Sequence, residues 1–216
     1  MKIVIVGPTH PYKGGIAQHT TELALRLAHE GHEVVLESWR HQYPARLYPG
    51  QLTVDDEDRD VAPFEHTRHR LTWYNPLTWI AAGRRAKRAD LVVVAHSNPF
   101  QIPAHVTMLR SARRIGSRPR RVLVAHNVMP HEPTIGSRWL LARLRRATDG
   151  VLVHSDEETR RASSYLPGVR AVQHALPPFG PSLTASDAAP KATEGSGATA
   201  HHPIRLLALG FVRAYK

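Results

Sequence analysis

The sequence predicts an α/β fold built on a doubly wound parallel sheet, with helices on both of its faces. Two observations support this prediction. Short runs of Val, Ile and Leu alternate with helical patterns of about 10 to 15 residues, which is the order expected of repeated βαβ units. These runs are apolar at nearly every position, as strands are when helices cover both faces of their sheet.

The first predicted unit consists of a strand, a glycine loop and a helix. Residues 2–6 form a β-branched run that ends at Gly7, and we expect a buried strand there. Leucines at helical spacing indicate a helix over 16–30, closed by Gly31 as its C-terminal cap. Residues 33–37 then supply a second strand. This order is the beginning of a βαβ unit.

The same alternation repeats along the chain, after a loop-rich segment over 39–63. Ser155 precedes three acidic residues and is predicted to cap a helix that starts at Asp156. In a sheet of this kind, ligands bind at the carboxyl ends of the strands. The other expected helices cover 76–88, 102–114 and 137–147, and the other expected strands cover 91–95, 121–125, 150–153 and 169–174.

The composition changes near the C-terminus. From about residue 177, Pro, Ser, Ala, Gly and Thr replace large apolar residues, which is typical of a linker. A new apolar run at 204–210 predicts a strand that opens another unit. We therefore expect a first domain over 1–177, a disordered linker over 178–203, and the first strand and loop of a truncated second domain over 204–216.

Composition excludes several classes of protein. The chain has no cysteine, which excludes disulfide scaffolds, thiol catalysis and Cys-ligated metal sites. No apolar run approaches the roughly 20 residues of a membrane-spanning helix, and the N-terminal apolar run is too short for a signal peptide. We therefore expect a cytoplasmic protein.

The net charge of +11 is concentrated in the middle of the chain. Residues 67–146 contain 16 Lys and Arg, whereas Asp90 and Glu132 are the only acids there. Three explanations stay open: solvated helix faces, attraction to an anionic membrane or to phosphorylated substrates, and nucleic-acid binding. Few aromatic residues lie between the basic ones, which argues against binding of single-stranded nucleic acid.

A glycine pair marks the first candidate binding site. Gly14 and Gly15 lie between the first strand and the N-terminus of the first helix, where backbone N–H groups and the helix dipole favour an anion. The spacing matches neither the dinucleotide fingerprint nor the phosphate loop of nucleoside triphosphatases. A tight turn without a ligand therefore stays an alternative.

Polar residues follow the strand at 121–125. His126 and Asn127 come directly after it, and His131 and Glu132 follow a few residues later. Side chains at this place point into the crevice where such folds bind substrates. The zinc-protease spacing HExxH is absent, so we expect no metal.

Two further patterns are not expected to carry chemistry. Asp56-Glu57-Asp58 resembles the DxD motif that holds a metal in other sugar transferases, but no apolar strand leads into it, and a solvated turn is the simpler interpretation. Ser155 lacks the GxSxG elbow of a serine nucleophile, and its capping position explains it.

The order of seven stretches resembles the N-terminal half of family 4 glycosyltransferases, which are retaining enzymes of the GT-B architecture. The resemblance covers the chain apart from the linker. The matching stretches are Pro11 to Ala17, Gly31 to Val34, Trp39 to Pro44, Asn75 to Trp79, Ala125 to Glu132, Val153 to Ser155 and Gly210 to Lys216.

The resemblance implies two Rossmann-like domains that face each other across a cleft, of which this chain holds the acceptor-side domain. Gly14, Gly15, Arg213 and Lys216 would contact the diphosphate of a nucleotide-sugar donor. His126 would be the catalytic residue that lines the cleft beside the transferred sugar, although the family has no clearly assigned protein nucleophile. Positive charge at the leaving diphosphate supplies the stabilisation that a metal would otherwise give, so no cofactor is expected. The residues expected to line the acceptor side of the cleft are Asn127, His131, Glu132 and His19.

The sequence departs from the family in its C-terminal part. The donor-binding domain with its paired glutamates does not follow Lys216, so we expect the chain to be incomplete for catalysis alone. We expect the N-terminal part of a glycosyltransferase that acts on a sugar or lipid-linked acceptor at the inner face of a membrane, with the missing domain or a separate chain completing it. The alternatives are a non-catalytic module that binds an acceptor or a partner protein, and a basic nucleic-acid-binding domain.

Overall fold

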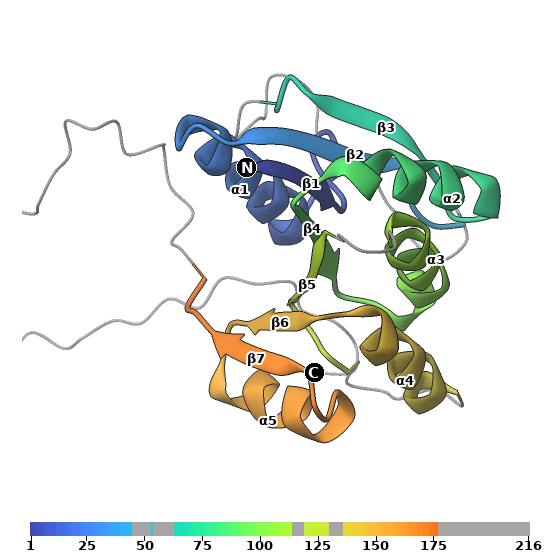
Figure 1. Ribbon diagram of the computed structural model, residues 1–216, viewed down its shortest axis with the longest axis vertical. Helices are drawn as coiled ribbons and strands as arrows, with labels where there is room; N and C mark the ends of the chain where they lie inside the picture. The colour runs from blue at the N-terminus through green and yellow to red at the C-terminus, as the bar shows by residue number, and fades with distance from the viewer. Residues whose placement is uncertain (45–52, 54–62, 114–118, 130–135, 177–216) are drawn as a thin grey trace, which may run out of the picture. The chain divides into compact units, whose positions relative to one another are not determined.

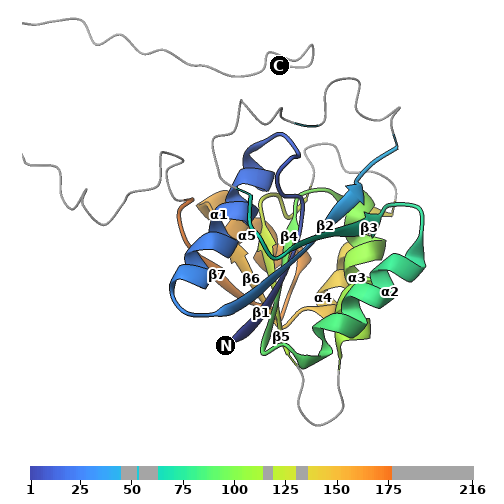
Figure 2. The ribbon, with the colours of Figure 1, turned by 90° about the horizontal axis from the view of Figure 1, so that it is seen from above.

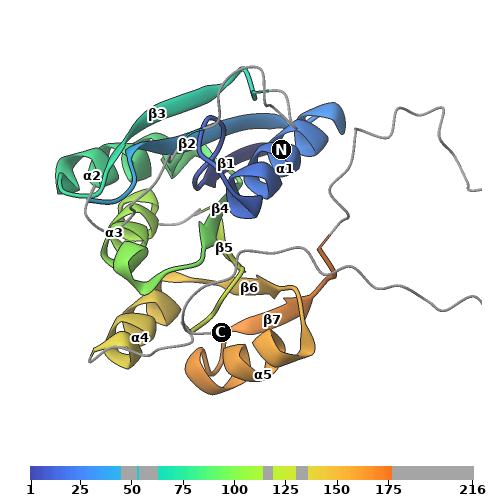
Figure 3. The same ribbon diagram turned by 180° about the vertical axis from the view of Figure 1, so that it is seen from behind.

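The computed structural model describes residues 1–44, 53, 63–113, 119–129 and 136–176, all within one compact unit, Met1–Pro181 (Figure 1). Its centre is a seven-stranded parallel sheet in the order β3-β2-β1-β4-β5-β6-β7, which Figure 3 shows from behind. The predicted α/β fold with a doubly wound parallel sheet is therefore confirmed. The strands are β1 (Lys2–Val6), β2 (Glu33–His41), β3 (Thr67–Thr72), β4 (Leu91–His96), β5 (Arg120–Ala125), β6 (Gly150–Val153) and β7 (Arg170–Gln173).

Helices cover both faces of the sheet. One face carries α1 (Gly15–His29) and α5 (Asp156–Tyr165), and the other carries α2 (Pro76–Arg85), α3 (Ile102–Ala112) and α4 (Ser137–Ala147), as Figure 2 shows. Two short 3-10 helices, η3 (Ala86–Arg88) and η4 (Pro99–Gln101), precede β4 and α3. None of the described helices is both long and apolar enough to cross a membrane.

Each strand supplies side chains to two cores, because successive residues point to opposite faces. Ile3 and Ile5 of β1 belong to the core that includes Ala24 of α1. Val6 belongs to the larger core on the other face, which includes Met108 of α3. Burial of both faces explains why the strand sequences are almost continuously apolar.

Two glycines permit close packing of helices. A Cβ at Gly83 of α2 would lie 2.4 Å from the backbone oxygen of Met108, so only a residue without a side chain lets α2 approach α3 there. A Cβ at Gly7 would lie 2.9 Å from the Cβ of Ala95 and 3.2 Å from Thr20 of α1. Gly7 thus lets the first helix pack directly against the carboxyl end of β1.

The observed elements differ from the predicted ones mainly at the β3 edge. The strand β3 falls in a segment for which no element was predicted, and β2 continues to His41 instead of ending at residue 37. β3 carries no apolar run because its residues 68–70 are polar and exposed. In β2 the apolar run is broken by Glu37 and Ser38, although both are buried. Ser155 caps α5, since its side chain accepts a hydrogen bond from the Glu158 N–H, as predicted.

Several predictions lie outside the described residues. They are the linker over 178–203, the strand and loop over 204–216 with Arg213 and Lys216, the acidic run Asp56 to Asp58, and His131 and Glu132.

Candidate functional site

The strand order reverses between β1 and β4. β1 pairs with β2 on one side and with β4 on the other, so connections leave the sheet in opposite directions from this point. Crevices form outside the carboxyl ends of strands at such a switch point, and they are the usual ligand sites of open parallel sheets. The loop after β1 and the residues that end β4, β5 and β6 all meet at this edge.

The glycine loop presents a helix N-terminus that no side chain caps. Gly14 is the N-cap of α1 with φ of +110°, a conformation that L residues rarely adopt, and a Cβ there would meet nothing within 4 Å. The first turn of α1 contains no acidic residue. Backbone N–H groups of a first helical turn lack partners within the helix, so this arrangement suits an anion.

Hydrogen bonds to α1 and within the loop hold the glycine loop in place. The hydroxyl oxygens of Thr9 and Thr21 lie 2.6 Å apart, and the Thr21 hydroxyl also accepts a hydrogen bond from the His10 N–H. The Tyr12 N–H donates to the carbonyl of Thr9. These bonds tie the loop to α1, so its backbone is positioned before any ligand arrives.

Three histidines form a triangle next to this loop. His19 extends from α1, His126 follows β5 and His154 follows β6. The distances between ring centroids are 5.1 Å for His19 and His126, 5.4 Å for His19 and His154, and 5.2 Å for His126 and His154. The predicted site residues His19 and His126 are thus neighbours, whereas sequence analysis gave no role to His154.

Burial keeps two of these imidazoles neutral. It lowers the pKa of His126 to about 3, with further lowering by the charges of His19, His154 and His96. It lowers the pKa of His19 to about 4, with smaller effects of His154 and Arg26. Both side chains are therefore uncharged near pH 7 and can act as neutral hydrogen-bonding groups.

The orientation of His154 follows from its partner. Its Nδ1 lies 2.9 Å from the carbonyl oxygen of His174, and because a carbonyl only accepts, Nδ1 must carry the proton. The buried Nε2 atoms of His154 and His126 have no hydrogen-bond partner among the residues that the structure describes. Unpaired buried polar atoms are costly, so these atoms are candidates for ligand contacts.

Two further histidines are buried near the carboxyl edge of the sheet. His96 ends β4 and His105 belongs to α3; both are fully buried, and their ring centroids are 5.6 Å apart. The backbone N–H of His126 donates to the His96 carbonyl. Burial lowers the pKa of His96 to about 4 and that of His105 well below its ordinary value, with His96 adding to the second effect.

A buried glutamate positions the segment that carries His126. Glu158 of α5 accepts a hydrogen bond from the Val128 N–H, with 2.5 Å between nitrogen and Oε2. Its other oxygen accepts from Arg161 Nη1 at 2.9 Å. Asn127 lies between the two fixed residues, is half-buried and has no hydrogen bond within the described residues.

We expect Glu158→Ala to loosen this segment. The substitution leaves the buried Val128 N–H without a partner, which costs about 1 to 3 kcal/mol of unfolding free energy. Urea denaturation measures that loss, and hydrogen exchange at the Val128 amide should become faster. Glu157→Ala is the matched control, because Glu157 also pairs with Arg161 but is exposed. Equal losses in both variants would contradict the positioning role.

The structure brings together part of the predicted site. Gly14, Gly15, His19, His126 and Asn127 all lie at the carboxyl edge. Sequence reasoning missed His96 and His154, although a signal was present: β4, β5, β6 and β7 each end in or are followed by a histidine, the four being His96, His126, His154 and His174. Within the described ranges, no group of three or more His, Asp or Glu side chains is arranged to hold a metal ion.

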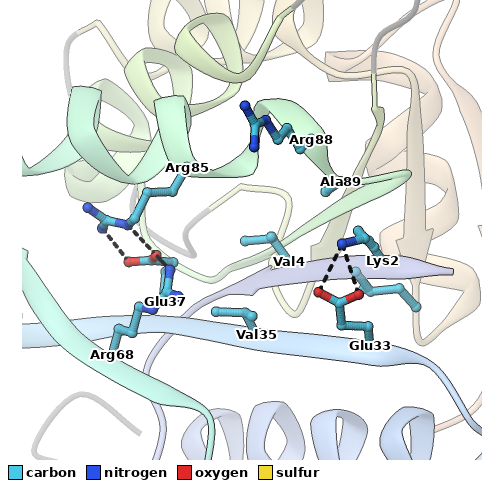
Figure 4. Close-up of a pocket in the computed structure, with 10 residues that line it drawn as sticks. Lys2, Val4, Glu33, Val35, Glu37, Arg68, Arg85, Arg88 and Ala89 are labelled. Atoms are coloured by element: carbon cyan, nitrogen blue, oxygen red, sulfur yellow. Dashed lines mark hydrogen bonds and ion pairs between the residues drawn. The ribbon is translucent and has the colours of Figure 1, made fainter.

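A pocket of ≈ 170 Å³ lies elsewhere, at the amino ends of β1 and β2 (Figure 4). Its floor includes Val4 and Val35, and the buried carboxylate of Glu37 forms one wall. Arg85 binds both oxygens of this carboxylate, with Nε to Oε1 at 2.7 Å and Nη2 to Oε2 at 2.6 Å, and Arg68 approaches it at 3.3 Å. The charged groups of this wall, Glu37 with Arg85 and Arg68, are thus paired with one another.

Some of the central positive charge is structural. Arg121 is buried and forms two hydrogen bonds to the carboxylate of Asp149 through its guanidinium, and Arg85 pairs with Glu37. Other members of the predicted basic clusters are exposed, among them Arg84, Arg88 and Arg110. The clusters are therefore a mixture of ion pairs and solvated helix faces.

A model described as Glycosyltransferase Family 4 matches residues 13–173, which is more than half of the chain. Comparison with curated proteins gives no match.

Solved structures with a similar fold include three of an alpha-glucosyltransferase. The complex with UDP and DNA containing a HMU base is 15% identical with a TM-score of 0.54 over 82% of this chain and 42% of that chain. The complex with UDP and DNA containing an A:G mismatch is 17% identical with a TM-score of 0.51, covering 80% and 40%. The complex with UDP-glucose and DNA containing an abasic site is 15% identical with a TM-score of 0.50, covering 81% and 42%. The chain thus spans about two fifths of the length of these structures.

Proposed function

The chain belongs to Glycosyltransferase Family 4, and from that premise we propose that it forms the acceptor-side half of a sugar transferase with a nucleotide-sugar donor. The observation that carries the proposal is the meeting of an uncapped helix N-terminus with neutral histidines at the carboxyl edge. An anion and a sugar need those two kinds of group. The alpha-glucosyltransferase with a similar fold was solved with UDP-glucose, which supports a donor of this class.

Some residues would bind the donor diphosphate, and others would orient the transferred sugar and the acceptor. The N–H groups beside Gly14 and Gly15 would hold the donor diphosphate through the dipole of α1. The neutral imidazole of His126 would form a hydrogen bond to the sugar that is transferred, and Asn127 would contact the acceptor. Arg213 and Lys216, which lie outside the described residues, would neutralise the leaving diphosphate as their family counterparts do.

The first test measures release of nucleoside diphosphate by the 216-residue chain. The donors are UDP-glucose, UDP-N-acetylglucosamine, GDP-mannose and TDP-glucose, and binding of UDP is followed in parallel by NMR. Where release is measured, we expect His126→Ala to lower it about 100-fold, the size of effect seen when one stabilising hydrogen-bond donor is removed. His29→Ala, at the exposed far end of α1, is the control and should leave release unchanged.

The outcomes separate the candidate functions. Release that depends on His126 supports the transferase. UDP binding without release supports the alternative, a binding module. Neither binding nor release, with the chain shown to be folded, would overturn the proposal.

The place of action is a separate part of the proposal. Exposed arginines such as Arg84, Arg88 and Arg110 would attract anionic lipids by long-range potential. We propose on this ground that the protein works in the cytoplasm, in peripheral contact with the inner face of a membrane. The acceptor there would be a glycan, free or linked to a lipid.

A further inference from the structure

Two of the sequence stretches that resemble the family remain without a role at the site described above. They are Trp39 to Pro44 and Asn75 to Trp79. In the fold the first stretch begins within β2 and continues past its end, and the second follows β3 after a turn that contains Trp73 and Tyr74. Phe100 of the η4 turn, which follows β4, lies beside Tyr43 and Trp73. All three segments end at the carboxyl edge of the sheet, on the β3 side of the glycine loop.

Aromatic rings from these segments form a connected row, the aromatic row. Neighbouring ring centroids lie 6.2 Å apart for Tyr43 and Phe100, 5.9 Å for Phe100 and Trp73, 5.5 Å for Trp73 and Tyr74, and 6.1 Å for Tyr74 and His41. The row is open to solvent, since Tyr74 is 59% exposed and Phe100 is 42% exposed.

Hydrogen bonds fix the backbone that joins β3 to α2 and carries Trp73 and Tyr74. Asn75 caps α2 by accepting from the Leu77 N–H at 3.0 Å. The Trp79 indole N–H donates to the Thr72 carbonyl at 2.7 Å. The Trp73 N–H donates to the His41 carbonyl at 2.9 Å, which ties the end of β3 to the end of β2.

Exposed aromatic side chains that lie together leave apolar area in contact with water, which is unfavourable unless a ligand covers them. Large apolar side chains at the surface of a protein mark binding sites when they lie together. Because the bonds above fix the backbone that carries Trp73 and Tyr74, a ligand would lose little free energy in ordering that segment. The arrangement is therefore suited to recognition.

The chemistry of the row favours a saccharide. The face of an aromatic ring carries partial negative charge and attracts the polarised C–H groups on the face of a pyranose. The hydroxyls of Tyr43 and Tyr74 and the exposed amide of Asn98 belong to the same segments and match sugar hydroxyls. The buried Gln42 donates to the Tyr43 oxygen at 3.2 Å.

The other occupants fit less well. Arg40 is the one charged residue in the segments 39–44, 72–79 and 96–101, so the row lacks the cations that nucleic acid needs. An alkyl chain would leave the hydroxyl and amide edges without partners. We infer that the aromatic row binds the acceptor of the proposed transferase, that this acceptor is a saccharide, and that one face of its ring stacks on Tyr74 and Phe100; this inference rests on the proposed function.

The test uses the 216-residue chain and three probes: methyl β-D-glucopyranoside, methyl α-D-mannopyranoside and methyl N-acetyl-β-D-glucosaminide. Saturation-transfer NMR should show the strongest transfer to the C–H protons on one ring face of at least one probe. Tyr74→Ala and Phe100→Ala should each weaken binding about two- to tenfold, the effect of one aromatic contact. Tyr74→Phe keeps the ring and should bind nearly as the unaltered chain does.

The matched control is Trp139→Ala. Trp139 is 58% exposed, but it belongs to α4, away from the aromatic row, and its replacement should leave probe binding unchanged. No transfer to any probe at about 10 mM, or binding by both alanine variants that equals binding by the unaltered chain, would overturn the inference. Two other results would also overturn it. Tyr74-dependent contact with only the alkyl chain of decyl glucoside would indicate a lipid, and Tyr74-dependent binding of a (dT)12 oligonucleotide would indicate a nucleic acid.

The inference and the proposed function can fail separately. Glycoside binding that needs Tyr74, without release of nucleoside diphosphate from any donor, would keep the aromatic row and reject the transferase. Release that needs His126 but is unaffected in both its rate and its acceptor KM by Tyr74→Ala would keep the transferase and reject the aromatic row.

Discussion

Lowering the pH from 7 to 5 is expected to destabilise the domain by several kcal/mol. His96 and His105 are fully buried, and burial keeps their pKa values below the ordinary 6.5, at about 4 for His96. The unfolded chain therefore binds more protons than the folded one between about pH 6.5 and pH 4. Stability is complete above this window and is lost as the pH falls through it.

The expected size of the effect is large. For His96 the full shift corresponds to about 3 kcal/mol, and each such histidine removes up to about 1.4 kcal/mol per pH unit. His19 and His126 act in the same direction but contact solvent, so they contribute less. The buried pair together can remove about 4 kcal/mol by pH 5, which is most of the stability of a domain at the low end of the ordinary range, about 5 kcal/mol.

Urea denaturation followed by circular dichroism at half-unit steps of pH measures the slope. His105→Leu removes one buried titrating group, and its slope below pH 6.5 should be shallower by about 1.4 kcal/mol per pH unit. The comparison concerns slopes, so a change in absolute stability of the variant does not affect it. A stability that stays flat from pH 7 to pH 5 would contradict the neutral buried pair.

Arg85→Ala is expected to cost about 3 kcal/mol of unfolding free energy, because it leaves the buried carboxylate of Glu37 without its main partner. Glu37 is 1% exposed, and Arg85 holds both of its oxygens. The hydrogen bond to Glu37 raises the pKa of Arg85, so the guanidinium stays charged at every ordinary pH. Arg68→Ala should cost less than about 1 kcal/mol, since this side chain is 43% exposed and makes one longer contact.

A double variant distinguishes the loss of the ion pair itself from the cost of leaving one buried charge without a partner. In Glu37→Leu with Arg85→Leu no buried charge is left alone, and apolar side chains fill the space. Replacing both members of a buried ion pair is often nearly neutral, so the double variant should be more stable than Arg85→Ala. Thermal unfolding monitored for all four proteins gives the comparison. If Arg68→Ala and Arg85→Ala cost the same, the two contacts are equivalent and the explanation is wrong.

The sequence predicted the sheet because its inner strands are covered on both faces. β1 and β4 read as continuous apolar runs, and the glycines that end the helical patterns marked the turns. β3 was missed because Arg68, His69 and Arg70 are all exposed, and such a strand carries no periodic signal. The C-terminal half of β2 was missed although Trp39 within it is fully buried.

The candidate site was predictable only in part. Gly14 and His126 lie next to ends of strands, where the fold class alone places ligands. The triangle of His19 with His126 and His154 depends on how α1 crosses the sheet, which local patterns do not specify. The aromatic row likewise joins segments that are about 30 residues apart along the chain, as Tyr43 and Trp73 are.

The two outermost of the described strands, β3 and β7, also affect how readily copies of the protein associate at high concentration. An open parallel sheet exposes unpaired backbone groups along its two margins, and these can recruit a strand of another copy. β3 places two arginines and a histidine on one margin, whereas β7 at the other is four residues long and begins with Arg170. Two copies that met margin to margin would bring guanidinium groups together and form few backbone bonds. Part of the basic excess thus acts against aggregation.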